Sequence, residues 1–147
     1  MNHLMKAETA KINFSPVGFQ LMAEDFLCYY DGFKPQKFSI VSYFLCGRAI
    51  ELALKARHLQ VQVQGQVKGQ FGHDLEKSYS ALPACEQLLT PSEVELLKKV
   101  NDVYKSKYFE YVDPRDAATG FSRFPSIDEL AILARKIVTQ ARKVLSN

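Results

Sequence analysis

A column of charged side chains lies within the apolar stretch from Phe38 to Leu59. Arg48, Glu51 and Lys55 follow one another at spacings of three and four residues, which places them on one face of a helix. Two cations around one carboxylate could hold an anionic ligand. They could equally pair on a solvated surface, where each pair would contribute about 0.2–0.5 kcal/mol. Burial decides between these interpretations, so the sequence leaves both open.

His73 and Asp74 form the second candidate group, at the start of an expected helix. The carboxylate of Asp74 could cap that helix, and the imidazole of His73 could pack against its neighbours. Alternatively, the imidazole could act as a general base at neutral pH or help to bind an anion. The neighbouring sequence offers no obvious nucleophile.

Basic and aromatic residues are interleaved in a third group, at 98–115. Its members are Lys98, Lys99, Tyr104, Lys105, Lys107, Tyr108, Phe109, Tyr111 and Arg115. Proteins that bind single-stranded nucleic acid use this mixture for phosphate attraction and base stacking. The spacing also fits aromatic side chains packed in a core beside a solvated basic face.

Composition and motif content limit the function classes. The 147 residues, 47% of them hydrophobic, suit one globular domain spanning 1–147. A net charge of +3 is too small for general attraction to nucleic acid, so binding would need local clustering. The sequence has no GxxxxGK, GxGxxG or HExxH motif and no C-x-x-C pair. We therefore expect no metal or cofactor, and the lack of an apolar leader or membrane span indicates a cytoplasmic protein.

Helix signals predict an all-α, four- to five-helix up-and-down bundle around the 38–59 helix. Capping patterns open three of the helices, at Ser15-Pro16, at 90–93 and at 126–129. Residues 1–14 are expected to be a partly ordered lead-in. Valine and glutamine alternate around glycines near 60–71, which predicts a short hairpin or irregular insertion. We expect helices at about 16–30, 38–59, 73–82, 91–108 and from 127 onward, with a long loop at 111–125.

Three segments together resemble the HEPN domain family of small helical bundles. They are AIELALKARHL at 49–59, GHDLEKSYSAL at 72–82 and VYKSKYFEY at 103–111, in the family's order and spacing. The resemblance covers the chain from about residue 38 to its end. It implies a helical bundle, frequent homodimers, and an association with RNA cleavage, toxin–antitoxin systems or nucleotide-linked partners.

The ribonucleases of that family carry an arginine followed after four to six residues by a histidine near the last helix. Arg115 and Arg123 lie in the corresponding region, and no histidine follows either of them. The resemblance therefore favours a non-catalytic homodimeric module, within a toxin–antitoxin or defence system. It would bind RNA, a nucleotide or a protein partner through 98–123 and the Arg48, Glu51 and Lys55 column.

Two alternatives stay open from the sequence. One is an atypical metal-independent ribonuclease toxin, in which His73 is the base and Arg115 or Arg123 stabilises the phosphate. The other is a structural protein that only dimerises or binds another protein.

Overall fold

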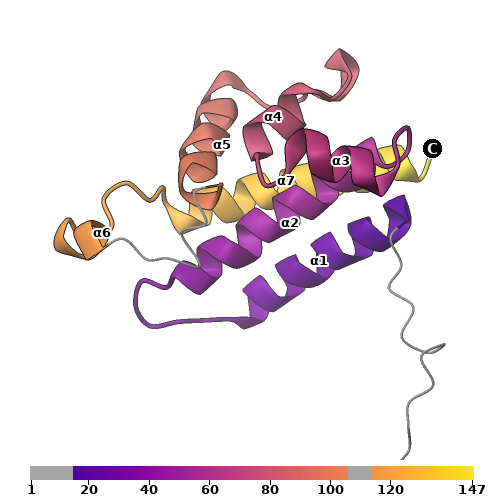
Figure 1. The fold of residues 1–147 in the computed structure, drawn as a ribbon. Helices are drawn as coiled ribbons and strands as arrows, with labels where there is room; N and C mark the ends of the chain where they lie inside the picture. Colours follow the sequence, from indigo (N-terminus) through magenta and orange to yellow (C-terminus); the bar gives the residue numbers. More distant parts are fainter. Residues whose placement is uncertain (1–14, 106–113) are drawn as a thin grey trace, which may run out of the picture.

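The computed structural model describes residues 15–105 and 114–147, and its regular elements there are all helical (Figure 1). The predicted all-α class is thereby confirmed, while the expected lead-in at 1–14 lies outside the described residues. In chain order the elements are α1 (Pro16–Gly32), α2 (Ile40–His58), α3 (Gln64–Phe71), α4 (Leu75–Ser80), the 3₁₀ turn η2 (Ala84–Glu86), α5 (Pro91–Tyr104), α6 (Pro114–Ala118) and α7 (Ile127–Leu145).

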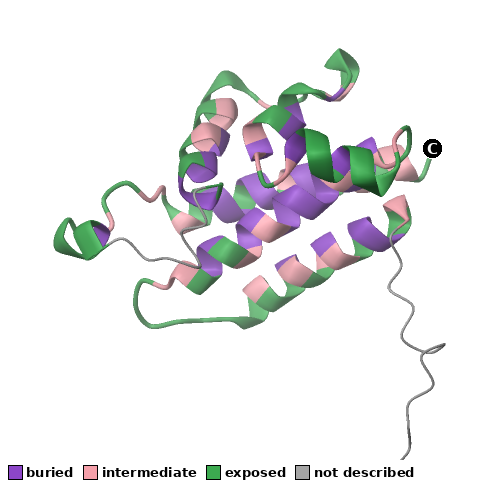
Figure 2. Cartoon of the chain, viewed as in Figure 1, coloured by how far each residue is buried: buried purple, intermediate pink, exposed green. Residues whose placement is uncertain are grey.

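Helix α2 is the centre of the bundle, as the sequence predicts. It packs against α1, α4, α5 and α7, and Figure 2 shows buried residues along most of its length. Cys46, Ala49, Ile50, Ala53 and Ala56 are all 0% exposed. The small alanine side chains allow neighbouring helices to approach closely, and the apolar surface they remove from water stabilises the bundle.

The predicted helix starts are confirmed by their capping contacts. The Gly18 N–H donates to Ser15 Oγ at 3.0 Å, and Thr90 and Glu93 exchange the two hydrogen bonds of a capping box. The Glu129 N–H donates to Ser126 Oγ at 3.4 Å. Each cap satisfies a backbone donor that the helix itself leaves unpaired, which fixes where α1, α5 and α7 begin.

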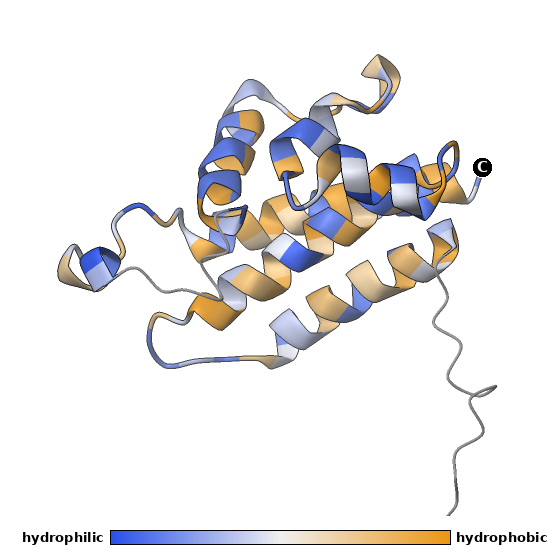
Figure 3. Ribbon diagram, viewed as in Figure 1, coloured by the Kyte–Doolittle hydropathy of each residue, from blue (hydrophilic) through white to orange (hydrophobic). Residues whose placement is uncertain are grey.

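Helices α1, α2 and α7 all pack against one another, and apolar residues extend along both α1 and α2 (Figure 3). Two ion pairs also join α1 to α7. Arg142 Nη2 lies 2.6 Å from Glu24 Oε2, and Arg135 Nη2 lies 2.5 Å from Asp31 Oδ1. Because these charges are partly exposed to solvent, burial of apolar surface contributes more than the ion pairs to holding the three helices together.

The expected hairpin or irregular insertion near 60–71 is wrong, because residues 64–71 form helix α3. Val67 and Phe71 are four residues apart and both are buried, at 2% and 4% exposure. The alternating Val61 and Val63, which suggested strands, are instead exposed in the preceding turn. Phe71 stacks on the buried ring of His58 with a centroid separation of 4.2 Å, which attaches α3 to α2.

The long loop expected at 111–125 also contains a helix within its described part, the short α6. The segment after α6 packs on the N-terminal end of α2, where Phe121 stacks on Phe38 at a centroid separation of 4.2 Å. The Tyr43 hydroxyl donates to the carbonyl of Pro125 at 2.6 Å. With α3 and α6, the described residues hold more helices than the five expected.

Gly47 gives the first test of this packing. A Cβ at Gly47 would lie 2.7 Å from Cδ2 of Tyr104, whereas one at Gly69 would meet nothing within 4 Å. We expect Gly47→Ala to lower the free energy of unfolding by about 1–3 kcal/mol through overpacking. Gly69→Ala, on α3, is expected to keep or raise it by up to about 1 kcal/mol. Denaturant unfolding of the two variants checks this, and equal effects would contradict the close approach of α5 to α2.

Candidate functional site

Glu51 is the buried centre of the charged column, with 3% of its side chain exposed. Its Oε1 lies 3.0 Å from Arg48 Nη1, 2.5 Å from Lys55 Nζ and 3.1 Å from His73 Nδ1. Its Oε2 accepts a hydrogen bond from the Tyr104 hydroxyl. The column is therefore not a solvated salt-bridge surface, because its carboxylate is enclosed by four donors.

The surrounding donors keep Glu51 ionised. Burial raises the pKa of Glu51, but the hydrogen bond and charge of Lys55, the Tyr104 hydroxyl and the charge of Arg48 together hold it below its usual value. Burial and the Glu51 charge both raise the pKa of Tyr104, so the phenol keeps its proton and donates it. Because an ionised carboxylate can only accept, His73 Nδ1 must be the donor in its contact with Glu51.

Asn101 of α5 fixes the backbone that carries His73. Its Oδ1 accepts from the Leu75 N–H at 2.7 Å, and its Nδ2 donates to Asp74 Oδ1 at 2.9 Å. Asp74 also accepts from the Lys77 N–H at 3.0 Å. Asp74 therefore caps α4, as one of the two interpretations of the sequence predicts. Sequence reasoning missed Asn101, which is 1% exposed. The available signal was a polar amide on the otherwise apolar face of the 91–104 helix.

A groove of about 550 Å³ lies beside this cluster, between α1, α2 and α3. Its volume falls within the range of small-molecule sites, about 300–1,000 Å³. Its lining combines six apolar side chains with three cations, a glutamine and a histidine. The apolar lining is Phe19, Met22, Phe26, Leu52, Leu59 and Val67, and the polar lining is Arg48, Lys55, Gln64, Lys68 and His73, with Gly72.

The groove surface carries an excess of positive charge. Among the described residues that line it, Arg48, Lys55 and Lys68 are cationic and none is acidic. Glu51 lies behind the lining and offsets one of these charges. Lys68 has no ion-pair partner within the described ranges, and His73 is 55% exposed. The groove can therefore attract an anion while its apolar side chains contact an uncharged portion of the same ligand.

The basic and aromatic group at 98–115 is not one continuous surface in the described part of the chain. Tyr104 is buried, at 7% exposure, and its ring is not available for base stacking. The exposed Lys105 ammonium lies 3.9 Å from Asp74 Oδ2. The predicted site residues Lys107, Tyr108 and Tyr111 lie outside the described residues.

The structure does not bring His73 together with Arg115 or Arg123. Arg123 makes a bidentate ion pair with Asp116, with N–O distances of 2.6 and 2.7 Å. Arg115 lies exposed on α6. Helix α6 projects from the left end of the molecule, well away from α4, which His73 precedes (Figure 1). The cations near His73 are instead Arg48 and Lys55.

Two classes of site find no support in the described ranges. No group of three or more His, Cys, Asp or Glu side chains is placed to hold a metal ion among those residues. The helices there include none with the length and apolar character needed to cross a membrane.

Comparison with known proteins adds no relative: no family model, curated protein or solved structure matches this chain. Fold and site together define an all-α helical protein with a cationic groove next to a buried carboxylate. The resemblance to HEPN domains continues to depend on the three sequence segments given above.

Glu51→Gln tests whether the buried carboxylate is compensated as described. Removing its charge leaves Arg48 and Lys55 without their partner, so we expect the free energy of unfolding to fall by about 3–5 kcal/mol. Glu95→Gln is the matched control, because Glu95 is exposed and, among the described residues, forms an ion pair with Lys98 alone. Denaturant unfolding should show the control close to wild type, and an equally stable Glu51→Gln would contradict the assignment.

The same variant has a defined pH signature. The pKa of Glu51 in the folded state lies below its usual value of 4.5, so the unfolded state binds more protons in this range. The stability that Glu51 contributes is therefore complete above pH 4.5 and is lost as the pH falls through the folded-state pKa. Between pH 7 and pH 3, the free energy of unfolding should therefore decline less steeply in Glu51→Gln than in wild type.

Proposed function

We propose that this chain is a non-catalytic, HEPN-like helical module that binds a nucleotide in the groove between α1, α2 and α3. The observation that carries the proposal is the composition of the groove. Three cations and a histidine line the groove together with six apolar side chains, and the described lining includes no acidic side chain. A nucleotide combines the two matching parts, an anionic phosphate and a flat, largely apolar base.

Each part of a nucleotide has matching side chains in the lining. Arg48, Lys55 and Lys68 would contact the phosphates, and charge-assisted hydrogen bonds of this kind are roughly twice as strong as neutral ones. Phe19 and Phe26 would face the base and exclude water from it. Glu51 positions two of the three cations and lies behind the lining, so it does not repel the phosphates directly.

A nucleotide fits this site better than an RNA strand does. The groove volume of about 550 Å³ suits a single small molecule, and the buried Tyr104 cannot stack with the bases of a longer strand. The sequence resemblance agrees with a nucleotide-linked role. It also extends the proposal to a homodimer with a cognate protein partner in a toxin–antitoxin or defence system.

Lys68→Ala tests the proposal without disturbing the core, because Lys68 is exposed on α3. We expect it to weaken ATP binding by about fivefold, the loss of one exposed charge contact of about 1 kcal/mol. Lys99→Ala, on α5 in a different groove, is the matched control and should bind ATP like wild type. Isothermal titration calorimetry measures both affinities.

Two further measurements separate the proposal from non-specific charge attraction. Adenosine, which lacks the phosphates, should bind much more weakly than ATP, and ATP affinity should fall as salt rises. Wild-type protein that shows no saturable ATP binding would overturn the proposal. An equal loss in Lys68→Ala and Lys99→Ala would overturn the assignment to this groove.

A metal-independent ribonuclease is a second candidate, favoured by the contact between His73 and Glu51. The buried carboxylate fixes His73 Nδ1 as a donor and leaves Nε2 free to accept a proton on an exposed ring. A 2′-hydroxyl could give its proton to Nε2 while its oxygen attacks the adjacent phosphorus and displaces the 5′-oxygen. Arg48 and Lys55 would stabilise the phosphate in place of Arg115 or Arg123.

Incubation of RNA with the purified protein and a chelator tests this second candidate. Cleavage by wild type that is lost in His73→Gln would support it, since glutamine can still donate to Glu51 but cannot act as the base. RNA that stays intact with wild type would exclude it and leave the binding proposal standing.

A further inference from the structure

His58, the last residue of α2, is a buried imidazole that contacts two further helices. Only 6% of the residue is exposed. Its ring stacks on Phe71 of α3 with a centroid separation of 4.2 Å, and its Nε2 lies 2.8 Å from the carbonyl oxygen of Ser78 on α4. Because a carbonyl oxygen can only accept, Nε2 carries the hydrogen and donates it. His58 therefore joins both α3 and α4 to the central helix.

Helix α3 is held to the bundle by few side chains. Of its eight residues, Val67 and Phe71 are buried and the rest are exposed (Figure 2). Helix α4 is held more firmly, because Leu75 and Tyr79 belong to the main apolar core, whereas Val67 and Phe71 do not. If part of the structure moves to let water reach His58, α3 is therefore the element that moves at the lowest cost.

A positive charge on His58 is disfavoured in this position. Burial and the neighbouring charge of Arg57 lower the pKa of His58, while the hydrogen bond to Ser78 and the carboxylate of Glu86 act in the opposite direction. The balance places the pKa of His58 below its usual value of 6.5. The closed structure therefore favours a neutral imidazole.

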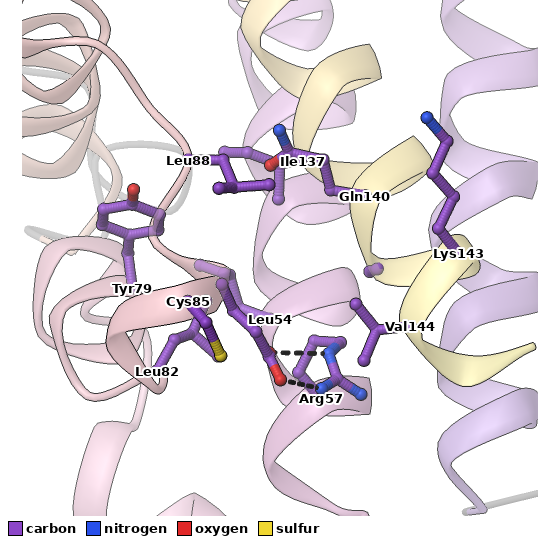
Figure 4. A pocket seen from close by; sticks show the side chains of 12 residues that line it. Leu54, Arg57, Tyr79, Leu82, Cys85, Leu88, Ile137, Gln140, Lys143 and Val144 are labelled. Carbon is purple, nitrogen blue, oxygen red and sulfur yellow. Dashed lines mark hydrogen bonds and ion pairs between the residues drawn. The ribbon is translucent and has the colours of Figure 1, made fainter. Parts of the chain in front are cut away.

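The charged groups around His58 come from α2 and η2, and they compensate each other. Arg57 Nε and Nη2 donate to the two carboxylate oxygens of Glu86 at 3.0 and 2.5 Å, a pair that Figure 4 marks with dashed lines. From α3 and α4, the groups in contact are the Phe71 ring and the Ser78 carbonyl, which carry no charge. Within the described ranges, the imidazole has no carboxylate partner of its own, so a proton bound there would stay uncompensated.

We propose that His58 is a pH-sensitive contact, which releases α3 from the bundle in mild acid and thereby opens the nucleotide groove. In the opened form water reaches the imidazole, which can then take up a proton. Helix α3 carries Gln64, Val67 and Lys68 of the groove lining, so its release removes an apolar contact and a cation from the nucleotide. The effect on the nucleotide rests on the function proposed above, whereas the release of α3 does not.

Acid favours the opened form because that form binds more protons. Above pH 6.5 the imidazole is mostly neutral in both forms, and the contribution of His58 to the closed form is complete. As the pH falls from 6.5 towards the lower pKa of the closed form, the opened form alone becomes charged. Uptake of one proton should raise the opened fraction by up to about tenfold between about pH 7.5 and 5.5.

Hydrogen exchange followed by mass spectrometry tests the release of α3 directly. Protection factors remove the pH dependence of the chemical exchange itself, and the core helix α7 reports global unfolding. We expect α3 to be less protected than α7, and its protection to fall by up to about tenfold between about pH 7.5 and 5.5. Equal protection of the two helices, or α3 protection that does not change with pH, would overturn the inference.

His58→Gln and His73→Gln separate the contributions of the two described histidines. Glutamine at position 58 can still donate to Ser78 but cannot be charged, so α3 protection should lose its pH dependence in this range. His58→Phe keeps a ring against Phe71 and serves the same purpose if His58→Gln does not fold. His73→Gln should keep the wild-type pH dependence, because His73 is 55% exposed. A pH dependence that persists in the His58 variants, or disappears in His73→Gln, would overturn the inference.

Addition of ATP tests the link between α3 and the groove. A ligand that binds the closed form should raise α3 protection in wild type and in His58→Gln alike. ATP that binds without protecting α3 would overturn this link. If wild type binds no ATP, the proposed function fails, and the pH dependence of α3 protection still tests the role of His58.

Discussion

The ionised carboxylate of Glu51, buried in the bundle, is the constraint on which the rest of this structure depends. A charge taken out of water is costly unless donors replace its hydration shell. Here the donors come from three segments: Arg48 and Lys55 on α2, His73 before α4, and Tyr104 at the end of α5. The need to satisfy one carboxylate therefore specifies how α4 and α5 sit on α2. Gly47 makes this arrangement possible, because its missing Cβ leaves room for the Tyr104 ring.

The same interaction shapes the groove surface. Arg48 and Lys55 are held by Glu51 on the side of α2 that faces α1 and α3, so their charges line the groove, while the carboxylate stays behind them. Helix α3 completes the groove with Val67 and adds Lys68 at its edge. Glu51 therefore contributes to folding and also holds Arg48 and Lys55 in place at the groove surface. Because these two side chains are already positioned, anion binding would need little rearrangement of them.

Much of the fold follows from local sequence signals. Capping residues set the starts of α1, α5 and α7, and the apolar circumference of the 38–59 stretch identifies the central helix. Helix α3 escaped prediction because Val61 and Val63 alternate as in a strand, whereas the buried pair is Val67 and Phe71. The charged column was identified by its spacing, but the burial of Glu51 depends on neighbours that the sequence does not place. A pocket of about 190 Å³ between α2, η2 and α7 could not be predicted, because three segments remote in sequence form it and no motif marks it.

A double-mutant cycle between Glu51→Gln and Tyr104→Phe measures the coupling that this account requires. Tyr104→Phe removes only the hydroxyl that donates to Glu51, so the two residues should share part of their contribution to stability. The account predicts a coupling energy of about 1–3 kcal/mol in denaturant unfolding. Strictly additive effects, with a coupling energy near zero, would show that the buried carboxylate does not join α5 to α2 and would contradict the account.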